Sequence, residues 1–154
     1  MVQFDLELTI LESKAFMLYI YYMADLGDSF FTCVGCMDGR VQAPIEDYGQ
    51  KRYDVLYPDT ITEAGLVGSL ANSPSQELLE AIKQKVLISV EKHHSKGIIV
   101  HGHQHCAGNP VEDNQHREET KQAAAVINSF VSEGIEVKPV FVNKTVGGWE
   151  VEEL

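Results

Sequence analysis

Short apolar segments alternate with amphipathic segments between residues 30 and 142, and this alternation limits the possible folds more than any other feature of the chain. Three of the apolar segments have the length of strands: 29–36, 97–103 and 135–142. Strands that alternate with helices build a parallel sheet with helices packed against it. We therefore predict an α/β fold, with a parallel-core sheet of about four to five strands and helices on both faces.

Two long helices are predicted between these strands. Ser73 is a candidate N-cap of the first helix, because Pro74 follows it at the first helical position and Gln76 completes the pattern of a capping box. Apolar residues then recur at helical spacing as far as Val90. The second helix is predicted over roughly 113–133.

Weaker patterns suggest further elements. They indicate a short helix at 44–50 and strands at 2–11, 52–57 and 147–154. Pro58 and the aspartate after it are expected to end the strand at 52–57.

Length and composition exclude several classes of protein. The 154 residues suit one domain with a single core, and a net charge of −11 argues against a nucleic-acid partner. Three cysteines are too few for a disulfide scaffold, so a reducing, cytoplasmic location is expected. The apolar stretch at 15–26 is too short to cross a bilayer, and no membrane association is expected.

Three potential metal ligands lie at the predicted ends of two strands. Cys36 ends one strand, and His103 and Cys106 form a His-x-x-Cys step where the other strand meets a turn. Ligands bind in parallel sheets beyond the carboxyl ends of the strands, where the strand order reverses. Thiolates and imidazoles suit zinc, and three protein ligands leave a fourth position open, as in catalytic zinc sites. The sequence therefore predicts a zinc site formed by these three residues.

Asp38 and Arg40 follow Cys36 at alternate positions. If the chain stays extended, all three side chains share one face. An aspartate beside an arginine stays ionised, because the cation favours the charged form. Asp38 could then accept a hydrogen bond from a water on the metal, or could bind the metal itself.

Two motifs of the sequence resemble those of a known family. "CMDGR" followed by "GHQHCAG" resembles the Cys-x-Asp-x-Arg and His-x-x-Cys motifs of the beta-class carbonic anhydrases. The resemblance extends over about 30–154, and "KPVFVNKTVGGWEV" is similar to the closing strands of that family. The sequence departs from the family pattern at Met37, Gly39 and Ala107, and at Thr62-Glu63 within "ITEAG".

The resemblance implies zinc-dependent, reversible hydration of carbon dioxide to bicarbonate by a zinc-bound hydroxide. Cys36, His103 and Cys106 would bind Zn²⁺, and Asp38, held by Arg40, would orient the hydroxide. The resemblance also implies a single zinc-binding domain, with 1–29 as an N-terminal extension and 30–154 as the core. A homodimer or a higher homo-oligomer is expected.

The same ligand set is compatible with two other functions. A related zinc hydrolase could act on another small electrophile, carbonyl sulfide or carbon disulfide, and the change at Thr62-Glu63 motivates this alternative. A non-catalytic zinc-binding module would instead keep Asp38 permanently on the metal.

The remaining cysteine, histidines and tryptophan have simpler interpretations. Cys33 points to the opposite face of its strand from Cys36, so it is assigned to the core rather than to a redox pair. His101 and His105 are expected as neighbours of the site that could pass protons. His116 is expected to be solvated, and Trp149 to serve packing or an interface.

Overall fold

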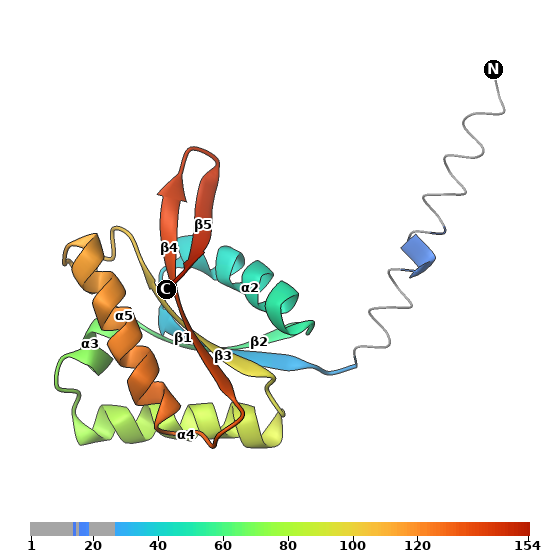
Figure 1. The fold of residues 1–154 in the computed structure, drawn as a ribbon, viewed down its shortest axis with the longest axis horizontal. Coiled ribbons are helices and arrows are strands. Elements are labelled where there is room, and N and C mark those ends of the chain that lie inside the picture. Colours follow the sequence, from blue (N-terminus) through green and yellow to red (C-terminus); the bar gives the residue numbers. More distant parts are fainter. Residues whose placement is uncertain (1–13, 15, 19–26) are drawn as a thin grey trace.

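A computed structural model describes residues 14, 16–18 and 27–154, and Figure 1 shows its sheet with the surrounding helices. The predicted strand at 2–11 and most of the stretch at 15–26 lie outside the described residues. The elements of the described core, in chain order, are β1 (Phe30–Cys36), α2 (Gly39–Tyr53), β2 (Tyr57–Glu63), α3 (Leu66–Ala71), α4 (Gln76–Lys92), β3 (Gly97–His103), α5 (Asp113–Asn128), β4 (Glu136–Thr145) and β5 (Gly148–Glu153).

Within the described residues, the strands form one five-stranded sheet in the order β2-β1-β3-β4-β5. The strands β2, β1, β3 and β4 are parallel, and β5 returns antiparallel to β4. The chain moves from β1 outward to β2 and then crosses to β3 on the other side of β1. The strand order therefore reverses between β1 and β3, and the carboxyl ends of these two strands form the switch point of the sheet.

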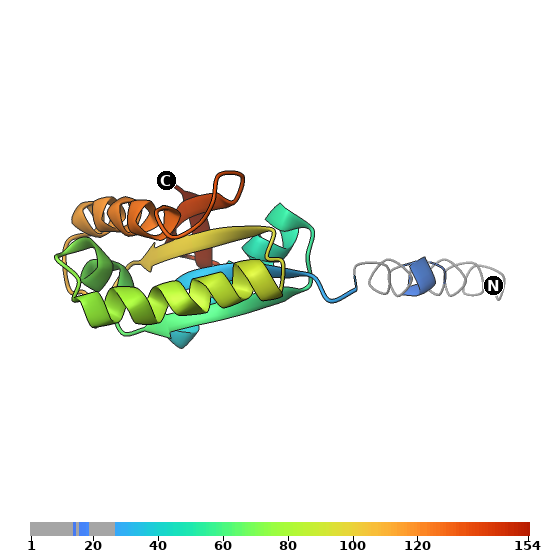
Figure 2. The same ribbon diagram turned by 90° about the horizontal axis from the view of Figure 1, so that it is seen from below.

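Helices cover both faces of the sheet, as Figures 1 and 2 show, and each face buries its own apolar layer. One layer lies under α3, α4 and α5 and includes Val34 of β1 and Val100 of β3. The other lies under α2 and includes Phe31 of β1 and Ile99 of β3. Neighbouring residues of β1 and β3 thus point to opposite faces, as expected for central strands covered on both sides. The predicted fold class, a mainly parallel sheet with helices on both faces, is confirmed.

The prediction was right only in part for the segment between β1 and α3. The helix expected at 44–50 forms as part of the longer α2, but the strand expected at 52–57 was wrong, because α2 runs to Tyr53 and β2 begins at Tyr57 and contains Pro58. Ile61 is the only fully buried residue of β2, so the strand carries little hydrophobic signal. Proline is tolerated there because β2 is an edge strand of the sheet.

The two long helices form as predicted, but their ends differ. Ser75, not Ser73, is the N-cap of α4, and its hydroxyl accepts a hydrogen bond from the Leu78 N–H at 3.2 Å. Ser73 has a φ of 54°, outside the helical region that the following proline disfavours. The helix α5 ends at Asn128 rather than near residue 133.

Candidate metal centre

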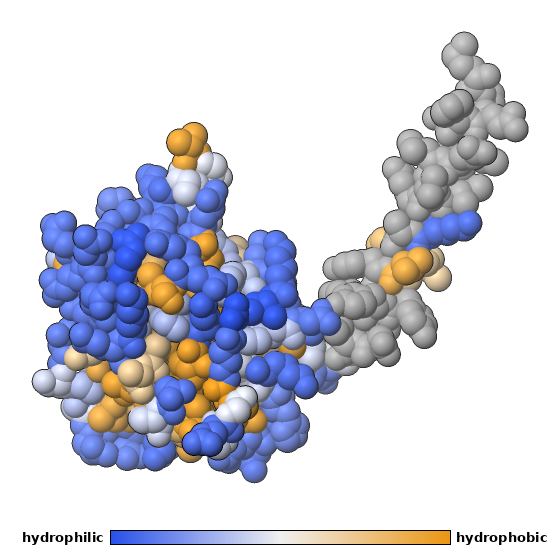
Figure 3. Space-filling model, viewed as in Figure 1, coloured by the Kyte–Doolittle hydropathy of each residue, from blue (hydrophilic) through white to orange (hydrophobic). Residues whose placement is uncertain are grey.

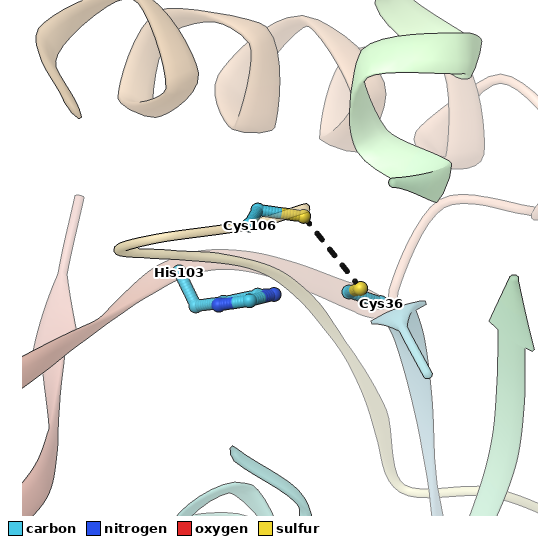
Figure 4. Close-up of side chains that lie close together, drawn as sticks. All are labelled: Cys36, His103 and Cys106. Carbon is cyan, nitrogen blue, oxygen red and sulfur yellow. Dashed lines mark hydrogen bonds between the residues drawn. The ribbon is translucent and has the colours of Figure 1, made fainter. Parts of the chain in front are cut away.

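Cys36, His103 and Cys106 come together at the switch point of the sheet. Cys36 is the last residue of β1, His103 is the last residue of β3, and Cys106 follows in the next loop. Their ligand atoms all lie within 4.8 Å of one another, and the two sulfur atoms are 3.7 Å apart (Figure 4). All three residues are buried, so the cluster is a compact internal site.

The donor set fits a metal ion. His103 Nδ1 lies 2.8 Å from the carbonyl oxygen of Gln104, and because a carbonyl only accepts, Nδ1 carries a hydrogen and donates it. The other nitrogen, Nε2, is buried and has no hydrogen-bond partner among the described residues. A histidine that donates through one nitrogen and leaves the other free is oriented as metal-binding histidines are. Together with two sulfur atoms, this arrangement could hold zinc.

Two glycines allow the loops around the cluster to approach each other. Gly65, which lies between β2 and α3, donates its N–H to Cys36 Sγ at 3.5 Å. A Cβ atom on Gly65 would collide with the backbone of Gly108, and a Cβ on Gly108 would collide with the backbone around Gly65. The Ala-Gly pair of "ITEAG" thus helps to shape the site, whereas Thr62 and Glu63, where the sequence departs from the family pattern, are the last residues of β2.

The three residues of the cluster differ in the direction in which their pKa values are shifted. Burial tends to raise the pKa of the Cys36 thiol, but the nearby imidazole of His103 and the backbone N–H of Gly65 outweigh it, so this pKa is lowered. Burial and the nearby charge of Cys36 raise the pKa of Cys106. Burial works against protonation of His103, but the nearby sulfur of Cys36 raises its pKa overall. Of the two thiols, Cys36 therefore loses its proton first.

Asp38 and Arg40 form a two-pronged ion pair beside the cluster. Arg40 Nη2 donates to Asp38 Oδ2 at 2.6 Å, and Arg40 Nε donates to Asp38 Oδ1 at 2.9 Å. Hydrogen bonds from Arg40 are the main reason that the pKa of Asp38 is lowered to about 2, and the charge of His103 lowers it further. Asp38 is therefore ionised throughout the neutral range.

The route to this pair differs from the one predicted. The chain is not extended from Cys36 to Arg40, because Asp38 is the N-cap of α2 and accepts a hydrogen bond from the Arg40 backbone N–H at 3.0 Å. The turn of the helix, rather than strand alternation, brings the two side chains together. Arg40 Nη2 also donates to the carbonyl oxygen of His105 at 3.2 Å, which connects the start of α2 to the loop carrying Cys106.

Trp149 belongs to the surroundings of the site, although sequence reasoning assigned it only to packing or an interface. The Arg40 guanidinium lies 4.9 Å from the centre of the Trp149 ring, within cation–π range. The same ring meets His103 edge-on, with their centres 6.5 Å apart. Nothing local in the sequence indicates these contacts, because they depend on β5 folding back beside β4.

The other histidines behave differently from expectation in two cases. His116, predicted to be solvated, is buried and lies edge-on against Phe141, with ring centres 5.5 Å apart. His101 is fully buried, and neither of its ring nitrogens has a hydrogen-bond partner among the described residues. Burial lowers the pKa of His101 to about 3, which makes it a poor carrier of protons. His105 lies in the loop beyond β3 with a φ of 55°.

In the part of the chain that the structure describes, every helix is too short or too polar to pass through a lipid bilayer.

The model of the family described as "Putative carbonic anhydrase" matches residues 26–154, which include every residue of the candidate site. A search of curated proteins found no match. Because the family model covers most of the chain, the chain belongs to this carbonic anhydrase family.

Proposed function

We propose that this protein binds one Zn²⁺ ion through Cys36, His103 and Cys106 and catalyses the reversible hydration of carbon dioxide to bicarbonate. The observation that carries the proposal is the convergence of two sulfur atoms and one unpartnered imidazole nitrogen within 4.8 Å, at the switch point of the sheet. Zinc with three protein ligands supplies a water of lowered pKa and a Lewis acid at its open position.

Each residue of the site would then have its own role. Cys36 and Cys106 carry the negative charge that holds a divalent cation, and His103 completes the set through Nε2. Asp38, kept ionised by Arg40, can only accept hydrogen bonds, so it would orient the attacking water through one of its protons. Arg40 would act as a positioning residue, because it fixes the Asp38 carboxylate and ties it to the loop at His105.

Assembly into a homodimer or a higher homo-oligomer is part of the same proposal. Phe16, Met17 and Leu18 precede the core and expose 64%, 66% and 72% of their surfaces. Figure 3 shows apolar atoms on this segment and at the tip of the β4–β5 hairpin, where Val146 is fully exposed. Apolar groups exposed in this way support burial against a second copy. Sedimentation at micromolar concentration is expected to give at least a dimer, and a monomer would contradict this part.

Stopped-flow carbon dioxide hydration with the zinc-loaded protein, from neutral to alkaline pH, tests the catalytic part. Hydration that increases toward alkaline pH is expected, because two thiolates donate more charge to zinc than two imidazoles would and make its water less acidic. No hydration at any pH, together with turnover of carbonyl sulfide or carbon disulfide, would favour the related hydrolase. No turnover of any of these substrates would favour a non-catalytic zinc module.

A further inference from the structure

A buried carboxylate on α5 contacts the loop that carries Cys106 and takes no part in the function proposed above. Glu119 of α5 is only 4% exposed. No lysine, arginine or histidine of the described chain forms an ion pair with it, and its partners are neutral amides. Burying a carboxylate costs free energy unless it is well hydrogen-bonded, so its presence calls for an explanation.

Three amide groups satisfy the Glu119 carboxylate. Asn109 Nδ2 donates to Oε2 at 2.6 Å, and Gln115 Nε2 and Asn72 Nδ2 donate to Oε1 at 2.9 and 3.1 Å. Asn72 is the C-cap of α3, and its side chain also donates to the carbonyl oxygen of Gly68. The carboxylate therefore joins α3 and α5 to the loop that contains Asn109.

Asn109 is the inner anchor of the loop that carries Cys106. Among residues 105–110, Cys106 is buried and Asn109 is half-buried, while His105, Ala107 and Gly108 are exposed. The Asn109 side chain fits against Gly68 of α3, where a Cβ atom would lie 2.6 Å from its amide group.

The same residue is coupled to Cys106 through the backbone. The Asn109 N–H donates to the carbonyl oxygen of Cys106 at 3.3 Å and closes a turn. A carboxylate only accepts hydrogen bonds, so it permits one orientation of the Asn109 amide, with the NH₂ group toward α5. Glu119 on α5 thus sets the position of Asn109, and with it the turn that begins at Cys106.

We propose that Glu119 is a positioning residue for the metal centre: its carboxylate holds Asn109 so that the turn at 106–109 presents Cys106 Sγ to Cys36 and His103. The inference rests on the proposed zinc site. It adds a requirement for a residue that never touches the metal and that no motif of the ligand segments indicates.

Glu119→Gln is the direct test, because it keeps the shape of the side chain but turns one acceptor into a donor that faces other donors. Zinc affinity, measured by competition with a chromophoric chelator, is expected to fall about tenfold, as for partners that orient metal ligands. The sulfur-to-metal absorption band of the cobalt(II)-substituted protein is expected to shift. Glu118→Gln is the matched control, since Glu118 is the adjacent, exposed residue whose carboxylate pairs with Lys121.

A reciprocal exchange separates positioning from general stability. In Glu119→Gln/Asn109→Asp, the new amide can donate to the new carboxylate, so zinc affinity is expected to recover toward the wild-type value. Asn109→Ser removes the anchor from the loop side and should fold even if Glu119→Gln does not, again with about tenfold weaker zinc binding. A double variant that binds zinc no better than Glu119→Gln would contradict the pairing.

A metal-independent readout keeps this inference separate from the zinc proposal. In the metal-free protein, diamide oxidises two thiols to a disulfide, and the 3.7 Å between the sulfur atoms favours a Cys36–Cys106 bridge. Peptide mapping is expected to show this bridge forming several-fold more slowly in Glu119→Gln than in Glu118→Gln. If wild-type protein binds no zinc, the proposed function fails, yet this rate still decides the role of Glu119. Equal rates and equal zinc affinities in both variants would overturn the inference, even if Glu119→Gln melts at a lower temperature.

Discussion

The middle of the sheet and its carboxyl edge each contain a cysteine and a histidine, but the pKa values of these residues are shifted in opposite directions in the two regions. Cys33 and His101 lie inside β1 and β3, whereas Cys36 and His103 end the same strands. Burial raises the pKa of Cys33 to about 11 and lowers that of His101 to about 3, so both are neutral at pH 7. At the edge, polar neighbours outweigh burial, so the pKa of Cys36 is lowered to about 6 and that of His103 is raised.

The difference between the two regions comes from their neighbours rather than from depth alone. The Cys33 thiol donates a hydrogen bond to the Thr60 hydroxyl at 3.5 Å, within an apolar layer. Cys36 meets a backbone N–H from Gly65 and a second sulfur from Cys106. A cysteine or histidine in this sheet therefore gains the chemistry of a ligand only where the strands give way to loops that supply polar groups.

The largest expected effect separates the two cysteines of β1. Cys36→Ser should reduce bound zinc to background, because the hydroxyl is a far poorer ligand for this ion than a thiolate. Cys33→Ser should keep a full complement of about one ion per chain, as expected for a mononuclear site. Metal analysis of the purified variants checks both, and an equal loss of zinc from both would show that the middle and the end of the strand do not differ in this way.

The next effect concerns turnover rather than metal content. Asp38→Asn should keep zinc and α2, since asparagine is also a good N-cap, but should lower carbon dioxide hydration by about 10²-fold or more. Arg40→Ala should also keep zinc and lower activity, because it frees the carboxylate. Stopped-flow assays beside metal analysis test this pair of variants. Loss of zinc from Asp38→Asn would instead make Asp38 a fourth ligand and the site closed.

Zinc binding by the edge cluster should depend strongly on pH. In the metal-free protein the raised pKa of Cys106 keeps a proton on its thiol, and this proton must leave when the ion binds. Zinc affinity should therefore rise with pH, about tenfold per unit for each proton released. Titration in a weakly buffered indicator dye measures the release. The pH dependence of zinc affinity should be unchanged in Cys33→Ser. A zinc affinity that does not depend on pH would contradict this assignment of protons.

The smallest effect is expected at His101. Leucine has a similar volume and removes two buried nitrogen atoms that have no hydrogen-bond partner among the described residues. The free energy of unfolding of His101→Leu should stay level or rise by as much as about 1–3 kcal/mol, measured by denaturant titration. Its zinc content should equal that of the wild type, whereas His103→Leu should lose zinc. Zinc loss from folded His101→Leu would place the mid-sheet histidine in the site.

The sequence predicted those parts of the molecule that carry a local signal. The strands β1 and β3 are continuous apolar runs, and the convergence of Cys36, His103 and Cys106 followed from placing them at the ends of these runs. The strand β2 was misplaced because an edge strand with one fully buried residue has no clear pattern. The extended geometry expected at Asp38 was wrong because the same side chain also caps a helix.

Contacts that join distant segments could not be predicted in this way. Trp149 reaches Arg40 only after β5 has paired with β4, and Glu119 reaches Asn109 only after α5 has packed beside α3. The burial of His116 has the same origin, since its helix lies over β3 and β4. A single sequence contains the residues of such contacts but not their distances.

X-ray absorption spectroscopy at the zinc edge of the wild-type protein tests the central claim most directly. The account predicts two sulfur ligands at about 2.3 Å, one imidazole nitrogen at about 2.0 Å and one further light atom, with one sulfur lost in any residual zinc bound by Cys36→Ser. Wild-type protein that binds no zinc, or zinc with fewer than two sulfur ligands, would contradict the account.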